Sequence, residues 1–127
     1  MYNKELTKGT LLPIILKLIS ENDKMYGYEI TQKVKEMTKG KIDISEGALY
    51  PILHKLESDG VLETEKVYIG KRVRKYYRIT ASGKLVITEL TAELNDFINT
   101  LNLIFNSKTV KKEFDILLLK QLKASVE

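Results

Sequence analysis

The stretch "EGALYPILHKLESDG", residues 46–60, has the spacing of a helix but carries a proline at its sixth position. Its apolar side chains recur at intervals of three and four residues, at Leu49, Ile52, Leu53 and Leu56. At 100° per residue they fall within an arc of about 100°, the width of one core-facing stripe. Pro51 lies roughly opposite, so the hydrogen bond that its missing N–H would have made to Gly47 is lost on the outward side. We therefore predict a helix from the N-cap Ser45 to Gly60, with one buried face and one small, open outward face.

Two more helices and a short strand are expected before this helix. Residues 10–22, "TLLPIILKLISEN", predict a helix capped by Thr10, with Pro13 in the first turn, where its N–H would have no helical partner. Apolar residues cover more than one side of this segment, so we expect it to be widely buried. A second helix is predicted from Gly27 to about Lys39, and residues 41–44, "KIDI", alternate as a short strand would.

A hairpin and a long helix are expected after the quoted helix. Residues 61–69 and 74–80 are rich in strand-forming residues and flank "GKRV", which predicts a hairpin with a basic tip. Thr80 can cap the long final helix. The apolar residues of that helix step by 3, 4, 3, 4 and 3 as a heptad seam, at Ile87, Leu90, Leu94, Phe97, Leu101 and Ile104. Residues 110–122 then predict a short amphipathic helix.

The order helix, helix, short strand, helix, hairpin, long helix is that of a winged helix-turn-helix. In that fold the third helix enters the major groove of DNA, and the hairpin, or wing, contacts the backbone or the minor groove. We predict a mainly α fold with a small β-hairpin. Residues 1–80 would form the winged-helix DNA-binding domain and residues 81–127 a C-terminal helical dimerisation region.

Two motifs give the sequence a resemblance to a known family. The stretches "GALYPILHKLESDGVL" (47–62) and "RKYYRITASG" (74–83) resemble the pattern of PadR-family transcriptional regulators, and "YGYEI" (26–30) adds to the match. The resemblance covers about residues 9–105. It implies a dimeric repressor, commonly of genes for detoxification or efflux, that senses small aromatic or drug-like molecules. Some members hold flat ligands between tryptophans at the dimer interface, and this chain has no tryptophan.

Composition narrows the class of protein. A chain of 127 residues is one domain, or a small domain with an appended helix. The formal charge of +4 is concentrated in residues 71–78, which hold five basic residues and no acid, so the remainder sums to about −1 (+4 − 5). There is no cysteine, no signal-like N-terminus and no apolar run near the length of a membrane span. We expect a cytoplasmic protein without a cofactor or a metal.

The expected DNA contacts fall on the outward face of the quoted helix and on the basic hairpin. They are Glu46, Gly47, Ala48, Tyr50, Pro51, His54, Lys55, Lys71, Arg72, Arg74 and Lys75. The basic residues of the hairpin tip suit phosphate contact, with Arg72 reaching into the minor groove, although a charge run can also be a solvated surface. Arg78 is expected to be structural.

Several of these residues have a structural alternative. Glu46 suits either a base contact, since a carboxylate can accept from cytosine, or the positive end of the helix dipole. His54, the only histidine, is either a DNA contact or plain surface, and it lacks partners for a metal or catalytic site. Tyr50 either packs or touches DNA. Tyr76 and Tyr77 must point to opposite faces of a strand, so one of them is expected in the core.

A dimer interface is expected from the heptad seam and part of the first helix, because so short a chain has little else to cover them. Its residues are Leu12, Leu16, Ile19, Leu90, Leu94, Phe97, Leu101 and Ile104. Packing of the seam on its own domain is the alternative. An effector cavity is expected in the same region, lined by Leu94, Phe97, Ile98 and Phe105.

The function predicted from the sequence is a sequence-specific DNA-binding regulator, a ligand-responsive repressor that acts as a homodimer on a palindromic operator. A winged-helix module for protein–protein contact is the alternative. Such a module would leave the outward helix face apolar and the wing uncharged, which Lys55, Lys71 and Arg72 contradict. An enzyme is disfavoured, since the sequence has no G-x-S-x-G, H-E-x-x-H or glycine-rich phosphate loop.

Overall fold

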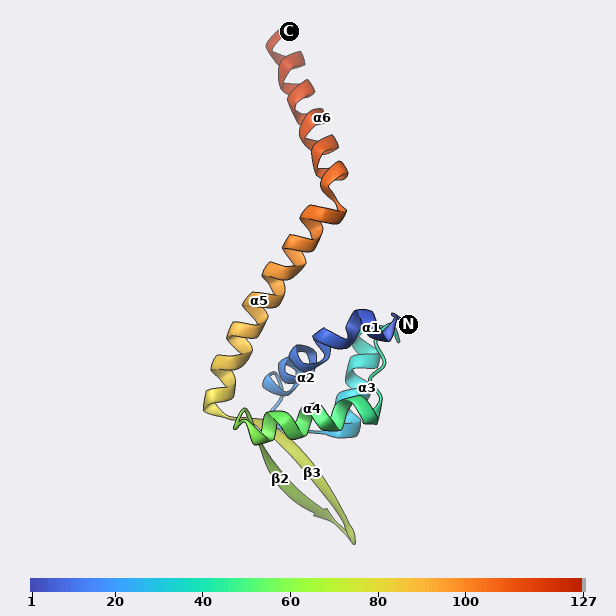
Figure 1. The fold of residues 1–127 in the computed structure, drawn as a ribbon, viewed down its shortest axis with the longest axis vertical. Coiled ribbons are helices and arrows are strands. Elements are labelled where there is room, and N and C mark those ends of the chain that lie inside the picture. The colour runs from blue at the N-terminus through green and yellow to red at the C-terminus, as the bar shows by residue number, and fades with distance from the viewer. Residues whose placement is uncertain (127) are drawn as a thin grey trace. The chain divides into compact units, whose positions relative to one another are not determined.

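The computed structural model describes residues 1–126, with side chains described for residues 1–107 and 115–124. The elements in chain order are α1 (Lys4–Thr7), the 3-10 helix η1 (Lys8–Thr10), α2 (Leu11–Ser20), β1 (Met25–Tyr26), α3 (Gly27–Met37), α4 (Glu46–Ser58), β2 (Leu62–Ile69), β3 (Arg72–Ile79), α5 (Ala81–Phe105) and α6 (Ser107–Val126) (Figure 1). The chain divides into two compact units, residues 1–91 and the residues from 92 onward. The predicted fold class, mainly helical with a small antiparallel sheet, is confirmed.

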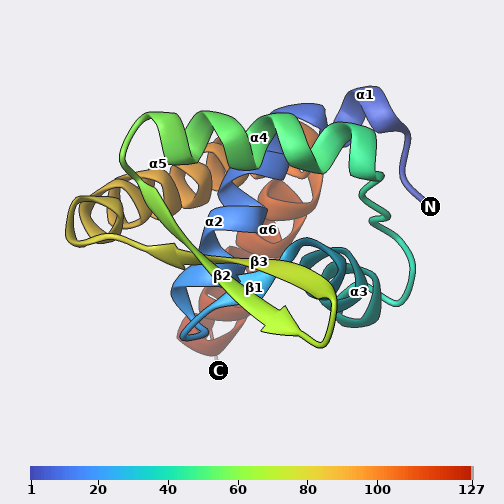
Figure 2. The same cartoon turned by 90° about the horizontal axis from the view of Figure 1, so that it is seen from below.

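The sheet contains three antiparallel strands in the order β1-β3-β2. β2 and β3 pair along all eight residues of each strand, so only Gly70 and Lys71 remain in the turn. Gly70 has a φ of +61°, the conformation that a tight hairpin turn requires. Arg72 and Val73, predicted in the turn, therefore belong to β3. The hairpin projects from the helical body of the first unit, beside α4 (Figures 1 and 2).

The third strand is not the predicted one. Residues 41–44 form an irregular loop, and the strand that pairs with the middle of β3 is β1. The alternation of "KIDI" has another cause, because Ile44 is buried in the core and Ile42 packs against it. The loop bonds to the end of α3 instead of to a strand, since the N–H of Ile42 donates to the hydroxyl of Thr38 at 3.0 Å.

One hydrophobic core stabilises the first unit. Its buried apolar residues are Ile15, Leu16, Leu18, Ile19, Met25, Ile30, Val34, Ile44, Leu49, Leu53, Leu56, Val61, Leu62, Tyr77 and Ile87. Leu16 and Ile19 are 0% exposed, so the prediction that they form a dimer interface is wrong. The reason is that α3 and β3 of the same unit contact α2 and cover it. Leu12 is half-buried and packs against this core as well.

α4 has the predicted caps and the predicted buried face. The hydroxyl of Ser45 accepts a hydrogen bond from the N–H of Ala48 at 3.3 Å, and Gly60 follows the helix with a φ of +75°. The inward residues are the predicted Leu49, Leu53 and Leu56, with Ile52 half-buried against the same core. Pro51 is exposed, so the carbonyl that lost its helical partner lies on the outward side of the helix.

Thr80 caps the N-terminus of α5, as predicted, and joins the helix to the start of β2. The Thr80 hydroxyl accepts from the N–H of Gly83 at 3.0 Å, donates to the carbonyl of Gly60 at 2.7 Å and lies 3.1 Å from the carbonyl oxygen of Val61. Gly83 is buried at this junction. A Cβ on Gly83 would collide with the Val61 carbonyl oxygen and would lie 2.7 Å from Cγ1 of Ile79. Only glycine therefore allows α5 to approach the hairpin so closely.

The first unit extends further along the chain than the predicted domain of residues 1–80. Its limit falls after Thr91, because Ile87 of α5 is buried in the core and Leu90 packs against it. Part of the predicted heptad seam thus packs within its own unit. The roles assigned to the two regions, DNA binding and dimerisation, stay predictions.

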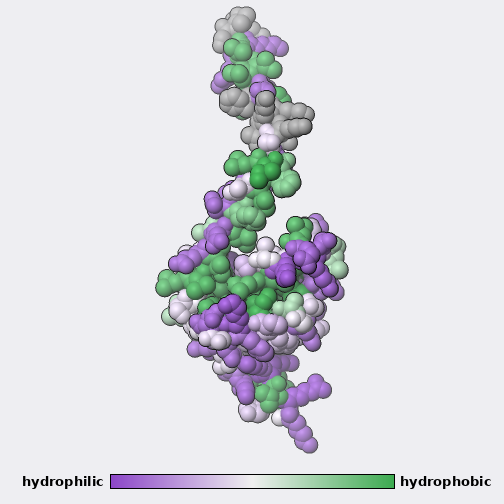
Figure 3. Space-filling model, in the orientation of Figure 1, coloured by the Kyte–Doolittle hydropathy of each residue, from purple (hydrophilic) through white to green (hydrophobic). Residues whose placement is uncertain are grey.

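The second unit exposes a large share of its apolar side chains. Those exposed on α5 and α6 are Phe97, Ile98, Leu103, Ile104, Phe105, Ile116, Leu117, Leu118, Leu119 and Leu122. Apolar atoms are visible along α5 in Figure 3, whereas the surface of the hairpin is mostly hydrophilic. α6 is longer than the helix predicted for residues 110–122, and the side chains of residues 110–114 lie outside the described ones.

We expect Gly83→Ala to lower the free energy of unfolding by about 1–3 kcal/mol, since the new methyl group must displace packed backbone. The matched control is Gly47→Ala, because Gly47 also lies in the first turn of a helix but only Ser45 Oγ, at 4.0 Å, is near its missing Cβ. That change should be neutral or stabilise by about 0.5–1 kcal/mol through helix propensity. Urea unfolding of both variants measures the difference, and equal effects would contradict the close packing of Gly83.

Candidate nucleic-acid interface

The outward face of α4 carries the predicted contact residues. Glu46, Gly47, Tyr50, Pro51, His54 and Lys55 are exposed, and Ala48 is half-buried. The rings of Tyr50 and His54 lie one turn apart, with centroids separated by 6.4 Å. Lys55 forms an ion pair with Asp59 at 3.0 Å, but both side chains are more than half exposed, so a stronger anion can displace Asp59.

Tyr50 lies against the start of α3. A Cβ on Gly27 would be only 2.6 Å from the Tyr50 hydroxyl oxygen and 3.0 Å from Cζ. The glycine therefore makes room for the ring, and the ring is still 38% exposed. Tyr50 packs against α3 and remains partly exposed, so the two alternatives for this residue are compatible.

The tip of the wing carries two free basic side chains. Lys71 and Arg72 are exposed, and within residues 1–107 and 115–124 no ion pair involves either of them. Apolar side chains accompany them, since Tyr68, Ile69 and Val73 are also exposed. The tip can thus offer both charge and apolar contact to a groove.

Arg74 does not lie at the tip, where it was predicted. Its guanidinium lies 4.0 Å from the ring centroid of Tyr26, and its Nη1 donates to the hydroxyl of Tyr76 at 3.4 Å. The hydrogen bond to Tyr76 is the main cause that raises the pKa of Arg74 above its usual value. Tyr26 and Tyr76 contact each other edge to face at 5.4 Å. Arg74 is therefore a half-buried cation, held over the ring of Tyr26 and by the hydroxyl of Tyr76.

Lys75 is likewise engaged away from the tip. Its Nζ lies 3.4 Å from Oε2 of Glu57 on α4 and 5.4 Å from the ring centroid of Tyr77. The prediction of four basic residues at the hairpin tip is thus wrong for Arg74 and Lys75. The reason is that their partners, Tyr26 and Glu57, come from other elements of the fold.

Arg78 has the structural role expected for it. It forms ion pairs with Asp23 at 3.6 Å and with Glu65 at 3.2 Å, and Glu65 also binds Lys24 at 3.3 Å. This charged cluster joins β3 to β2 and to the turn before β1. Tyr77, the neighbour of Arg78, is the core tyrosine of the predicted pair and is 1% exposed.

A cleft of about 340 Å³ lies between α4 and β3, and we call it the helix–wing cleft. Its lining residues are Tyr26, Gly27, Tyr50, His54, Val73, Arg74, Lys75 and Tyr77. Four of the predicted DNA contacts, namely Tyr50, His54, Arg74 and Lys75, therefore meet at one place. Sequence reasoning missed Tyr26 and Gly27 as part of this surface, although the stretch "YGYEI" could have indicated them.

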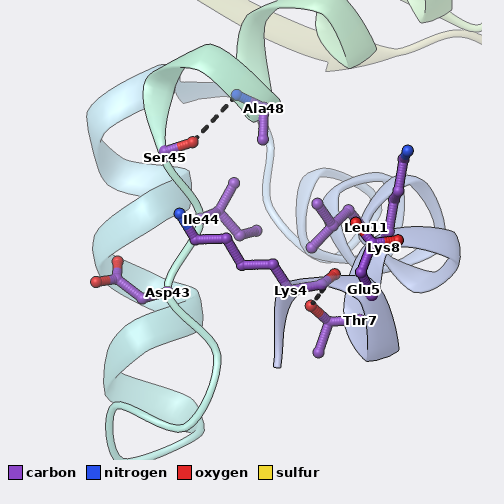
Figure 4. Close-up of a pocket in the computed structure, with 9 residues that line it drawn as sticks. All are labelled: Lys4, Glu5, Thr7, Lys8, Leu11, Asp43, Ile44, Ser45 and Ala48. Carbon is purple, nitrogen blue, oxygen red and sulfur yellow. Dashed lines mark hydrogen bonds between the residues drawn. The ribbon is translucent and has the colours of Figure 1, made fainter. Parts of the chain in front are cut away.

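A smaller hollow of about 230 Å³ lies where α4 begins (Figure 4). The side chain of Lys4 reaches across it toward Ile44, whereas the side chain of Lys8 points away. Glu5 and Asp43 line the same hollow, so its charges balance and favour no ligand of one sign. The side chains described also include no group of three or more His, Cys, Asp or Glu that could hold a metal ion. None of the described helices is long and apolar enough to span a bilayer.

Comparison with known proteins identifies this arrangement. Residues 15–89, more than half of the chain, match the "Transcriptional regulator PadR-like family". The chain belongs to this family. It is 34% identical over 86 residues to Transcriptional regulator Rv3488 of Mycobacterium tuberculosis, and the match covers 68% of this chain and 77% of that protein.

Solved structures of PadR-like proteins share the fold. A transcriptional regulator from Clostridium thermocellum matches with a TM-score of 0.71 and 28% identity, over 77% of this chain and 95% of that one. Bacillus subtilis PadR, whose structure was solved in complex with operator DNA, matches with a TM-score of 0.58 and 28% identity, over 64% of this chain and 46% of that one. The PadR-like family is one of transcriptional regulators, so the chain is a regulator and not an enzyme.

Burial of Tyr77 in this PadR-like fold predicts a pH dependence of stability. Burial raises the pKa of Tyr77 above its usual value of 10.0, so the unfolded chain loses this proton first. The stabilisation is present below about pH 10 and falls as the pH rises through the raised pKa of the folded state. The urea midpoint should fall as the pH rises above about 10, and less steeply in Tyr77→Phe. Tyr68→Phe, which changes an exposed ring, should keep the wild-type slope.

Proposed function

We propose that the chain is a repressor that binds DNA as a homodimer on a two-fold-symmetric operator in the cytoplasm. The single observation that supports this most is the pairing of an exposed α4 face with a wing whose tip carries the free cations Lys71 and Arg72. Among its structural relatives, Bacillus subtilis PadR is known in complex with operator DNA.

In this proposal the two elements have different tasks. α4 enters the major groove with its N-terminal half, where Gly47 and Ala48 leave room for a close approach to the base edges. Glu46, at the start of the helix, can accept a hydrogen bond from cytosine. Lys71 and Arg72 bind phosphates from the wing, and Lys55 does so from the end of α4. Two half-sites would lie about one helical turn apart.

The exposed apolar side chains of the second unit support a dimer. Leu94 and Leu101 are half-buried, while Phe97 and Ile104 of the same seam are 53% and 65% exposed. A seam of this kind pairs with an identical seam when two helices supercoil. We infer that the dimer interface uses Leu90, Leu94, Phe97, Leu101 and Ile104, and that Leu12, half-buried against its own core, also contributes.

Ligand response belongs to the same proposal. Phe97, Ile98 and Phe105 are exposed in one chain, so a second chain is needed to enclose an aromatic effector between them and Leu94. Such a ligand would release DNA only if it bound better to a dimer whose α4 helices were wrongly spaced.

The proposal is tested by fluorescence anisotropy with the DNA upstream of the gene and with a scrambled duplex, each at two salt concentrations. We expect tight, salt-sensitive binding with a preference for the upstream DNA, because phosphate contacts release counterions. Salt-sensitive binding without a preference would place the operator elsewhere. No binding to either duplex at low salt would contradict the proposal and favour a protein-interaction module.

The wing assignment predicts a change in the salt dependence. The double variant Lys71→Ala and Arg72→Ala should weaken binding to every sequence and lower the slope of log K against log salt by about two, one for each phosphate contact. The control variant Lys84→Ala and Lys120→Ala removes the same charge from exposed positions on α5 and α6. An equal change in both variants would mean that only net charge matters.

The dimer assignment is tested with two neighbouring residues on α5. Ile104→Asp places a charge on the seam and should shift sedimentation from dimer toward monomer. Leu103 is the matched control, since it is adjacent and 71% exposed but lies off the seam. Leu103→Asp should leave the dimer intact, and dissociation of both variants to the same extent would refute the seam.

A further inference from the structure

The helix–wing cleft has the chemistry of an anion site. Arg74 and Lys75 line it from β3, and Tyr50 and His54 of α4 line it from the other side. Among its lining residues there is no carboxylate. Outside the lining, Glu57 contacts Lys75 at 3.4 Å, and Glu29, whose charge also acts on Arg74, accepts a hydrogen bond from the N–H of Tyr26 at 3.1 Å. A group with several acceptor oxygens fits these donors, and an apolar or cationic group does not.

The donors of the cleft are held in position before a ligand arrives. The guanidinium of Arg74 lies over Tyr26 at 4.0 Å and bonds to Tyr76, while Lys75 lies between Glu57 and the ring of Tyr77. Long basic side chains normally lose rotamer entropy when they bind, and held ones lose less. This separates Arg74 and Lys75 from the free cations of the wing tip, which can follow any nearby phosphate.

We propose that the helix–wing cleft receives a single backbone phosphate of DNA, gripped from α4 by Tyr50 and His54 and from β3 by Arg74 and Lys75. The proposal rests on the proposed function, because it names the site at which one half-site phosphate is bound. A free phosphate ion shares this chemistry and is the other source of the same anion. Since one phosphate touches both elements, α4 and the wing must bind DNA as a unit.

That coupling is measurable in a double-mutant cycle with a random-sequence DNA duplex at low salt. Tyr50→Phe removes one hydroxyl and should weaken binding about tenfold without changing the salt slope. Lys75→Gln should weaken binding about tenfold and lower the slope by about one. If both residues bind the same phosphate, the affinity lost in the double variant should be much smaller than the product of the two single losses.

Lys66→Gln provides the matched control for the cycle. Lys66 lies directly opposite Lys75 in the β2–β3 pairing, but it does not line the cleft. The substitution Lys66→Gln therefore removes the same charge from the same part of the wing. Any loss of affinity in Lys66→Gln should multiply with the loss in Tyr50→Phe, because contacts to separate phosphates act independently. Multiplicative losses for both pairs would overturn the shared-phosphate site and leave the proposed function standing.

His54 gives a second readout that does not depend on any variant. It is the only histidine, so its imidazole protons give an isolated pair of NMR signals. We expect DNA to shift these signals, and inorganic phosphate to shift them in the same direction at higher concentration. DNA that binds without moving them would overturn the site. A shift with inorganic phosphate in a protein that binds no DNA would uphold the anion site with free phosphate as its source, and would refute the proposed function.

Discussion

The hydroxyl of Thr80 fixes the meeting point of four elements. Through Gly60 and Val61 it reaches the end of α4 and the start of β2, through the N–H of Gly83 it caps α5, and it directly follows β3. Gly83 allows this approach because any Cβ there would occupy the space of the Val61 carbonyl oxygen. Both ends of the wing are anchored at this junction, so the direction of the wing relative to α4 depends on it. The two residues lie three apart in the sequence, with Thr80 directly before α5 and Gly83 in the first turn of that helix.

A second close contact, between α4 and α3, fixes the position of an exposed side chain on the outer surface of the same unit. Tyr50 of α4 rests on Gly27 of α3, which brings the "YG" and "GALYP" stretches together. The inward side of α4 is fixed by Leu49, Leu53 and Leu56, so the position of Tyr50 follows from the packing of the core. If α4 binds DNA as proposed, side chains on a helix that is packed so firmly need little reordering on binding.

Much of this fold could be predicted from local patterns, because helix periods, caps and the heptad are read within one segment. The stripe of α4, its N-cap Ser45 and the hairpin were all accessible in this way. β1 was not, since a strand of two residues has no period and exists only by pairing with β3. The burial of Leu16 within its own chain could not be predicted either, because the sequence pattern does not distinguish an apolar residue covered by its own chain from one covered by a second copy.

The basic residues of the wing illustrate the same limit at the level of function. In the sequence they form one run, but in the fold Lys71 and Arg72 form no ion pair with any described residue, while Arg74 and Lys75 are bound to aromatic rings and to Glu57. Free cations supply attraction that is insensitive to geometry and is screened by salt. Held cations act only where a phosphate fits between the elements that hold them. In the proposed complex, a wing with both kinds of cation can therefore attract DNA of any sequence through Lys71 and Arg72, and it accepts one phosphate geometry through Arg74 and Lys75.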